Sequence, residues 1–460
     1  MKPSEFNVFV DAHVDGVVIA YNTFTGSMFT CDTGELARVE AALGAPDAAP
    51  ASARDAALRE RLVACGFLVA DELDERRALR PRYDRRQAST GAVALTLAPT
   101  VSCNFGCTYC FQEHPKRRMS EDDVLAVKRH VAGNLGPRSS LHVTWFGGEP
   151  LLAFDVIEEL TPYFHQIAGE RGGRFRQSMI TNGSLLDEEK VAFFAAQGNF
   201  DFLQITLDGP PAVHNKRRLT TNGQPTYDRI LANVERASDR LPITLRVNVD
   251  RSNVDHLAAF VDLLAARGLL PRVSVYLGHV LPYTDVCSSV GSAALTKEEF
   301  AAVQASFDFA LFERGIRPPF SLPKPRFGNL CIADNPGGAV VAPDGLVFRC
   351  WNEVATTERE ASGLLAPVSG AVISEGSARE NRAAWDGYDP FAHAVCQTCT
   401  VQPLCHGGCP WEARKNPVES TGHCTPLRWN LPDRLRLVHL KMVLDKHPPL
   451  AADGAAPAPC

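Results

Sequence analysis

The chain lacks a surplus of basic residues and lacks any long apolar segment, and each absence excludes a class of protein. Its 47 Lys and Arg stand against 53 Asp and Glu, a net charge of -6, which is atypical of proteins that bind nucleic acid or a membrane surface. No apolar run approaches the roughly 20 residues of a membrane span, and the first residues lack the order of a signal peptide. We therefore expect a cytoplasmic protein with small-molecule or peptide partners, and with no nucleic-acid or membrane partner.

Cysteine is scarce overall but strongly clustered. The chain has 14 cysteines in 460 residues, roughly 3%, against the roughly 8 to 10% of small disulfide scaffolds. Three of them lie between positions 103 and 110, and seven lie between 331 and 424. In a reducing compartment, clustered thiols more often bind metal or do redox chemistry than form disulfides. Both groups are therefore candidate metal sites.

The apolar pattern and the chain length indicate several domains. Residues 1–88 read as a small β unit followed by helices, residues 321–430 as a Gly/Pro/Cys-rich region, and residues 431–460 as a helix at 432–446 with a mobile tail. Between them, residues 89–320 alternate strands and helices, with strands expected at 93–99, 141–146, 175–181, 200–207, 243–249 and 272–278. Six such βα units predict a parallel sheet, either doubly wound or closed toward a barrel.

The first cysteine group follows the first of these strands directly. Cys103, Cys107 and Cys110 have the spacing C-x-x-x-C-x-x-C, and their thiolates can hold three irons of a [4Fe-4S] cluster that normally takes four cysteines. One metal position then stays open, as in catalytic sites. The alternative is a zinc site completed by a distant residue.

This spacing resembles that of the radical S-adenosylmethionine (SAM) superfamily, and later motifs extend the resemblance. These are Gly147-Gly148-Glu149-Pro150, Thr181-Asn182-Gly183 and Thr206-Leu207-Asp208-Gly209-Pro210. Each follows an expected strand, at the face where barrel enzymes assemble their active sites. The resemblance implies an α/β fold with a partial (β/α)6 radical SAM barrel.

The same resemblance implies roles for individual residues. The turn of Gly147, Gly148, Glu149 and Pro150 would bind the SAM amino group, with Glu149 as the acceptor. Tyr109 would contact adenine, and the ribose and the substrate edge would meet Thr181, Asn182, Thr206 and Asp208. Arg218 would close a His-Asn-x-x-Arg stretch that begins at His214. The alternative is that Glu149 and Asp208 only cap helices and that His214 is a core residue.

The second cysteine group resembles the seven-cysteine SPASM pattern of radical SAM enzymes that modify peptides. In that family, an outer auxiliary cluster would be held by Cys396, Cys399, Cys405 and Cys424, and an inner one by Cys331, Cys350 and Cys409. The inner set lacks a fourth thiolate, for which Cys287 is a candidate. Cys31 and Cys65 are expected to be buried residues of the first domain. Two zinc knuckles are the alternative interpretation.

The resemblance implies a peptide maturase that uses SAM and three [4Fe-4S] clusters, one SAM-binding and two auxiliary. It would cleave SAM to a 5′-deoxyadenosyl radical and oxidatively modify or cross-link a ribosomally synthesised precursor peptide, with flavodoxin or ferredoxin as reducing partner. Residues 1–88 loosely resemble leader-peptide recognition domains, which bind a peptide at a sheet edge.

Two alternatives stay open. One is a sulfatase maturase that forms formylglycine, although those enzymes start close to the barrel and carry an acid just after the cysteine matching Cys350, where this chain has Trp351 and Asn352. The other is a non-catalytic iron-sulfur electron carrier or peptide-binding module.

Overall fold

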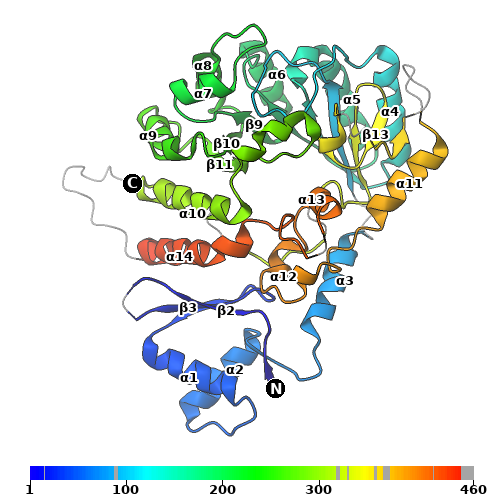
Figure 1. Cartoon of the computed structure of the whole chain (residues 1–460). Coiled ribbons are helices and arrows are strands. Elements are labelled where there is room, and N and C mark those ends of the chain that lie inside the picture. The colour runs from blue at the N-terminus through cyan, green and yellow to red at the C-terminus, as the bar shows by residue number, and fades with distance from the viewer. Residues whose placement is uncertain are drawn as a thin grey trace, which may run out of the picture.

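The computed structural model describes residues 1–14, 16–87, 92–316, 322–328, 331–356, 360–365, 373–417 and 419–446. The expected tail after the last helix and the expected boundary near Ala88 lie outside these residues. Figure 1 shows a large α/β part above, a Cys-rich part beside and below it, and a small N-terminal sheet with helices at the bottom. In the described parts of the chain, no helix is both long and apolar enough to cross a membrane.

The large part is built on six parallel strands in the order β11-β10-β9-β8-β7-β6. Their bounds are Ala92–Thr100 (β6), Ser140–Gly147 (β7), Phe175–Thr181 (β8), Phe200–Thr206 (β9), Ile243–Val249 (β10) and Ser274–His279 (β11). A doubly wound sheet reverses its strand order midway, whereas this order advances in one direction. The sheet therefore has the winding of a partial barrel, and the expected fold class is confirmed.

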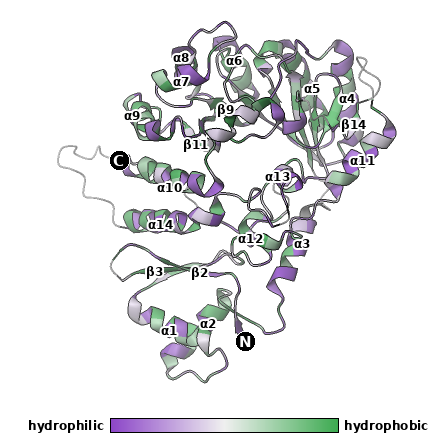
Figure 2. Cartoon of the chain, viewed as in Figure 1, coloured by the Kyte–Doolittle hydropathy of each residue, from purple (hydrophilic) through white to green (hydrophobic). Residues whose placement is uncertain are grey.

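Helices cover one face of this sheet because each strand presents alternate residues to it. On β10, Leu245 and Val247 are fully buried in the main core, whereas Thr244 and Arg246 on the other face are partly exposed. Figure 2 shows the hydrophobic residues gathered along these strands. The covering helices are α4 (Glu121–Asn134), α5 (Phe154–Glu170), α6 (Glu188–Gln197), α7 (Pro211–Arg217), α8 (Tyr227–Ala237) and α9 (Leu257–Ala266).

Three short strands that the sequence pattern did not reveal extend the sheet into the Cys-rich region. β12 (Gly338–Val341) pairs in parallel with β6, and β13 (Leu346–Phe348) and β14 (Gly363–Leu364) follow in antiparallel. Strands of two to four residues are too short to show a period of two. They join the second cysteine group to the first strand of the barrel.

The N-terminal unit packs on the end of the chain. Its sheet, β2 (Asn7–Asp11), β3 (Val18–Asn22) and β4 (Met28–Cys31), lies between two layers. On β3, Ala20 faces α1 (Thr33–Gly44) and α2 (Ala53–Ala64), while Ile19 and Tyr21 pack against Leu404 and Leu435. The N-terminal sheet and the last helix of the described chain, α14 (Leu427–Lys446), therefore lie side by side (Figure 1).

The remaining elements join these parts. β1 (Lys2–Pro3) pairs with β5 (Leu68–Val69). The helices still to be placed are α3 (Glu75–Gln87), α10 (Lys297–Glu313), α11 (Glu375–Asp386), α12 (Gln402–Cys405), α13 (Pro410–Lys415) and α14 (Leu427–Lys446). Short 3-10 helices are η1 (Pro150–Ala153), η2 (Val254–His256), η3 (Asp285–Ser292), η4 (Trp351–Glu353) and η5 (Ala394–Cys396).

Candidate active site

Three thiols converge on the loop that follows β6, and we call them the barrel triad: Cys103, Cys107 and Cys110. Burial, the nearby Glu149 and the thiols of Cys107 and Cys110 together raise the pKa of Cys103 to about 12, so the three thiols lie within electrostatic reach of one another. Burial also raises the pKa of Cys107 to about 11, although the nearby Arg218 lowers it. A thiolate at these positions therefore needs a cationic partner, which a bound metal supplies.

The Gly-Gly turn after β7 exists because two segments of backbone touch there. Gly147 has φ +118°, and a Cβ at Gly147 would lie 2.1 Å from the carbonyl oxygen of Thr100. A Cβ at Gly148 would lie 2.3 Å from the carbonyl oxygen of Ser102. The glycines thus admit the segment that leads into Cys103.

Glu149 is fully buried and joins the ends of β7 and β8. Its carboxylate accepts hydrogen bonds from Thr181 Oγ1 at 2.7 Å, Asn182 N at 2.7 Å and Leu151 N at 3.0 Å. It caps η1, in which Pro150 takes the first position. Burial raises the pKa of Glu149, and the bonds from Thr181 and Asn182 partly offset this rise. Glu149 therefore caps η1.

A buried polar network holds Tyr109 between β9 and β10. Its hydroxyl donates to Asp208 Oδ2 at 2.5 Å and accepts from Arg218 Nη1 at 2.8 Å and Asn248 Nδ2 at 3.1 Å. Asp208 also accepts from the backbone N–H of Asn248 at 2.9 Å. The ring of Tyr109 is fixed in place by this network beside the barrel triad.

His214 is a core residue. It is fully buried, its Nδ1 accepts from the backbone N–H of Asp208 at 3.2 Å, and its Nε2 lies 3.0 Å from Thr226 Oγ1. Burial lowers its pKa to about 2, so the ring is neutral.

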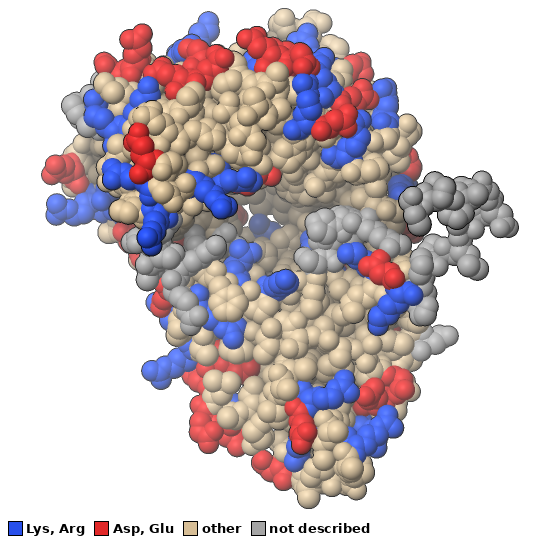
Figure 3. Space-filling model, turned by 180° about the vertical axis from the view of Figure 1, so that it is seen from behind, with Lys and Arg blue, Asp and Glu red and all other residues tan. Residues whose placement is uncertain are grey.

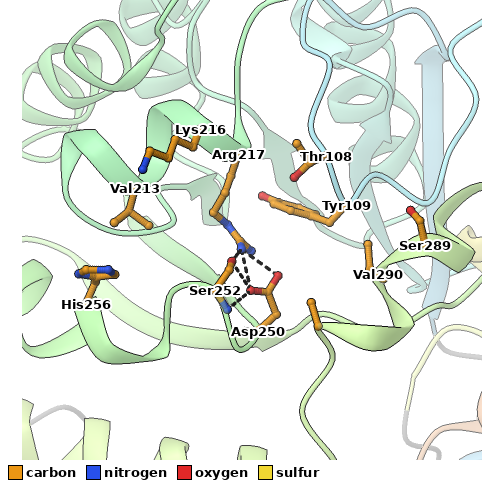
Figure 4. Close-up of a pocket in the computed structure, with 11 residues that line it drawn as sticks. Thr108, Tyr109, Val213, Lys216, Arg217, Asp250, Ser252, His256, Ser289 and Val290 are labelled. Carbon is orange, nitrogen blue, oxygen red and sulfur yellow. Dashed lines mark hydrogen bonds and ion pairs between the residues drawn. The ribbon is translucent and has the colours of Figure 1, made fainter.

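The sequence analysis missed Arg217, which is the residue before Arg218 and lines a cavity. Figure 4 shows Arg217 reaching from α7 toward Asp250 and Ser252, with the ring of Tyr109 beside it. Its Nη1 donates to both oxygens of Asp250 at 2.8 Å, and its guanidinium lies 4.9 Å from the centre of the Tyr109 ring. The cavity has a volume of about 400 Å³. The motif spacing pointed to Arg218 alone. The two arginines are adjacent in the chain, and the direction in which α7 runs gives their side chains different surroundings.

Two histidines beside thiols were also missed. His114 Nε2 lies 3.3 Å from Cys110 Sγ, and His423 Nε2 lies 3.9 Å from Cys396 Sγ. His114 follows Cys110 by four positions in a loop, and no periodicity marks it in the sequence. His423 immediately precedes Cys424, so its proximity to that cysteine was the one available signal.

Four thiols of the Cys-rich region form a second group, the outer quartet: Cys396, Cys399, Cys405 and Cys424. Burial and the three neighbouring thiols together raise the pKa of Cys396 to about 12. The N-terminal unit walls this group, because Cys399 and Cys405 pack against the same apolar cluster as Ile19 and Tyr21. From α3, Arg76 Nη1 donates to the carbonyl of Cys396 at 3.1 Å.

The remaining three thiols form the inner triad: Cys331, Cys350 and Cys409. Burial is the main cause that raises the pKa of Cys350. Glu353 raises this pKa as well, and so do the thiols of Cys409 and Cys331. Cys350 comes two residues after β13, near the edge of the barrel. The candidate fourth ligand, Cys287, packs in an apolar cluster with Tyr109 and Phe111, and its Sγ is 3.4 Å from the carbonyl oxygen of Thr284.

The chemistry of the three thiol groups allows iron-sulfur clusters, because buried and clustered Cys thiolates are the ligands that such clusters take. Within the described ranges, no three His, Cys, Asp or Glu side chains form a ready site for a single metal ion.

Comparison with known proteins defines the class. Residues 97–264, from β6 to α9, match the model of the radical SAM superfamily. A serine-type anaerobic sulfatase-maturating enzyme of Klebsiella aerogenes is 22% identical over 329 residues, which cover 67% of this chain and 77% of the relative. A cysteine-type enzyme of Clostridium perfringens is 28% identical over 156 residues, covering 32% and 40%.

A solved structure shares the fold. The structure of native anSMEcpe with bound AdoMet and a peptide superposes with a TM-score of 0.57 and 18% sequence identity. The superposition covers 76% of this chain and 98% of that one. Nearly all of the smaller protein thus has a counterpart here, and about a quarter of this chain is additional to it.

Proposed function

We propose that this protein is a radical SAM peptide maturase, which oxidatively modifies or cross-links a ribosomally synthesised precursor peptide. The barrel triad would hold a SAM-binding [4Fe-4S] cluster, and the inner triad and outer quartet would hold two auxiliary clusters. When bound, these groups supply reductive cleavage of SAM to a 5′-deoxyadenosyl radical and an acceptor for a second electron. The compartment would be the cytoplasm, where thiols stay reduced.

The chain's own residues orient SAM in this proposal. Glu149, whose oxygens already accept three bonds, has a lone pair left for the SAM ammonium. Tyr109 is held rigidly by Asp208 and Arg218 and presents its ring to the adenine. Thr181, Asn182 and Thr206, at the carboxyl ends of β8 and β9, would face the ribose and the substrate.

The observation that carries the peptide assignment is the unpaired edge of the N-terminal sheet. In the described part of the chain, β4 has only β3 as a neighbour. The backbone N–H of Asn22 donates to the carbonyl of Ser27. Along an antiparallel pair of strands, every second residue directs its N–H and C=O toward the partner strand. Because Ser27 points toward β3, the N–H groups of Met28 and Thr30 point away from it. These two donors can receive an extended leader peptide as a fourth strand.

Sulfatase maturation is the second candidate, because the sequence relatives carry that activity in their names. The residues after Cys350 speak against it. Trp351 is 38% exposed and stacks on Phe146 of β7, with ring centres 5.7 Å apart. The first acid, Glu353, is fully buried and accepts from the N–H of Cys350 at 2.8 Å. No carboxylate of the segment 351–353 is therefore free to act on a sulfatase peptide.

A cavity of about 430 Å³ beside Cys405 is our proposed site for the reducing partner. Lys324, Arg326 and Arg434 line it, and such a cluster of cations favours an acidic redox protein. A flavodoxin or ferredoxin fits this requirement. Cys405 belongs to the outer quartet, so a partner here would meet the proposed auxiliary cluster nearest to it.

The test replaces Thr30 by Pro, which removes the outward N–H without removing a ladder bond to β3. The matched control is Thr30→Ala, which keeps the N–H. We expect Thr30→Pro to weaken the binding of a leader-bearing precursor encoded near the gene at least about tenfold, measured by fluorescence anisotropy. Iron content and SAM binding should match the control, which shows that the fold is retained.

Equal leader affinity in both variants would contradict recognition at this edge. A parallel assay offers a sulfatase-derived Cys or Ser peptide to the wild-type enzyme. Formylglycine formation there, together with unchanged leader affinity, would replace the proposed function by the second candidate.

A further inference from the structure

Arg217 ties the loop of the barrel triad, residues 103–110, to the end of β10. It is the last residue of α7, and its backbone carbonyl accepts from the N–H of Thr108 in that loop at 3.0 Å. Its side chain reaches in the other direction, where Nη2 donates to the carbonyl of Asn248 on β10 at 3.1 Å. One residue therefore joins α7, the loop that carries the thiols and the fifth strand of the barrel.

The segment after α7 runs beside the same loop. The N–H of Gly106 donates to the carbonyl of Leu219 at 2.9 Å, and the N–H of Thr221 donates to the carbonyl of Asn104 at 3.0 Å. Residues 217–221 thus form a short antiparallel bridge to the first half of the loop. Because these bonds join backbone to backbone, a shift at the end of α7 also shifts the loop that carries the three thiols.

A buried carboxylate anchors the guanidinium. Nη1 of Arg217 donates to both oxygens of Asp250 at 2.8 Å, and both side chains are more than nine-tenths buried. Figure 3 shows Lys and Arg interspersed with Asp and Glu on the surface of the upper part of the molecule, where water and salt weaken ion pairs. The pair of Arg217 and Asp250 differs, because removal of one partner would leave the other charge buried and unpaired.

The same guanidinium covers one face of the Tyr109 ring. Its central carbon lies 4.9 Å from the ring centre (Figure 4). The hydrogen bonds of Tyr109 all meet at its hydroxyl oxygen, at the end of the long axis of the ring. Bonds at that point resist rotation of the ring about its long axis only weakly, whereas a cation attracted to the face restrains it. The plane of the ring therefore depends on Arg217 and, through the ion pair, on Asp250.

We propose that Arg217 is a positioning residue, which together with Asp250 sets the plane of the Tyr109 ring and the position of the barrel-triad loop for the binding of SAM. Groups that are held in place before a ligand arrives bind it without the cost of ordering them. The cavity of about 400 Å³ that Arg217, Asp250 and Tyr109 line leaves the ring room to turn once the guanidinium is removed. The inference rests on the proposed function, because SAM is the ligand for which Tyr109 is positioned.

The test uses the anaerobically reconstituted full-length protein and measures SAM affinity by equilibrium dialysis, iron content and melting temperature. The double variant Arg217→Met with Asp250→Asn removes both charges of the pair, so its melting temperature and iron content should match those of wild type. Its SAM affinity should fall about 3- to 30-fold, because the cation no longer holds the ring. The matched control Lys216→Met removes a cation that lines the same cavity and forms no ion pair within the described residues, and it should leave SAM affinity unchanged.

The conservative variant Arg217→Lys tests whether the cation itself is required. It keeps a positive charge beside Asp250 and Tyr109, although with fewer donors, so its SAM affinity should stay within about threefold of wild type. Equal SAM affinity in the double variant and wild type would overturn the inference, and so would a Lys variant that binds SAM as weakly as the double variant. Loss of iron or a lower melting temperature in the double variant would overturn it as well, because the pair would then be structural. A wild-type protein that binds no SAM would instead contradict the proposed function.

Discussion

The barrel triad and the outer quartet are both groups of buried thiols, yet their surroundings differ in kind. The barrel triad has three thiols on the loop after β6, with the charged and polar groups of Arg218, Asp208 and Tyr109 around it. The outer quartet has four thiols, and an apolar cluster from the N-terminal unit lies against it. Three thiols leave one position of a four-iron cluster without a protein ligand, and the polar neighbours can contact a bound molecule there. Four thiols beside an apolar wall leave no such position open.

This difference shows that buried cysteines can serve two purposes, and that the side chains packed around them decide which. Polar neighbours with fixed hydrogen bonds can orient a ligand without reorganising. An apolar wall excludes water and holds a group in place. In this proposal the barrel triad does chemistry on a ligand, and the outer quartet holds a redox group near the surface cavity of Lys324, Arg326 and Arg434.

The largest expected effect is removal of the barrel triad. Replacing Cys103, Cys107 and Cys110 by Ala should remove about one third of roughly 12 irons per chain and all formation of 5′-deoxyadenosine. Iron is measured after anaerobic reconstitution, and the nucleoside by chromatography. Cys65→Ala, outside the three thiol groups, is the control and should change neither value. Nucleoside formation by the triple variant would contradict the assignment of the catalytic site.

The wall of the outer quartet is tested at Ile19, which is fully buried against the Cys-rich region. Ile19→Ala should lower the free energy of unfolding by about 2 to 4 kcal/mol and speed loss of iron from the outer quartet, followed by its spectrum. Val63→Ala, at a position 44% exposed on α2, is the control. Equal iron retention in both variants would mean that the wall does not protect the site.

The polar side of the barrel triad is tested at Tyr109. Tyr109→Phe deletes the hydroxyl that joins Asp208 and Arg218, so SAM binding, measured by equilibrium dialysis, should weaken about tenfold while iron content stays unchanged. Tyr163→Phe, which removes a hydroxyl bonded to the carbonyl of Lys128 on the helical side, is the control. Loss of iron in Tyr109→Phe would indicate a role in cluster retention instead.

A pH-dependent effect is expected at Asp308, on α10 beside α14. Burial raises its pKa to about 6, although Arg434 at 3.7 Å lowers it. A carboxyl whose folded pKa is raised costs stability once it ionises, so its penalty develops as pH rises from about 4 to 6. Asp308→Asn should stabilise the protein by about 1 to 2 kcal/mol at pH 8 and less at pH 5, measured by urea unfolding. Equal gains at both values would exclude ionisation as the cause.

The smallest effect is expected at Cys287. This thiol packs with Tyr109 and Phe111 and bonds to local carbonyls, so Cys287→Ala should leave the spectrum of the inner auxiliary cluster unchanged. Cys350→Ala is the positive control and should alter that spectrum. Conversion of the inner cluster in Cys287→Ala would show that this thiol is its fourth ligand.

Much of the barrel could be predicted from the sequence. Strands 175–181 and 243–249 were expected with the bounds that the structure gives, because buried parallel strands read as apolar runs between helical stretches. Periodicity alone left the choice between a barrel and a doubly wound sheet open, and only the motif resemblance favoured the barrel. Strand order depends on how helices pack in three dimensions, and periodicity along the chain does not contain that information.

The contacts of the N-terminal unit could not be predicted. Alternation on β3 indicated a sheet with one buried face, but Ile19 and Tyr21 meet residues about 380 to 410 positions later in the chain. The sequence analysis treated residues 1–88 as a domain beside the barrel. The structure makes them a wall of the outer quartet, so a point variant tests leader recognition more cleanly than a truncation.

The sequence by itself determined which thiols belong to the barrel triad, because three cysteines within eight residues can reach one cluster only through the same loop. For the later cysteines the spacing alone did not separate two groups, and the resemblance to the SPASM pattern assigned Cys409 to the inner set and Cys405 to the outer one; in the structure Cys350 lies near Cys409 and Cys331, and Cys396 lies near Cys405. Only the tertiary structure decided that Arg217 has a carboxylate partner and Arg246 has none among the described residues. The physical reason is that burial and charge pairing depend on distances between segments far apart in the chain, and those distances are fixed by packing.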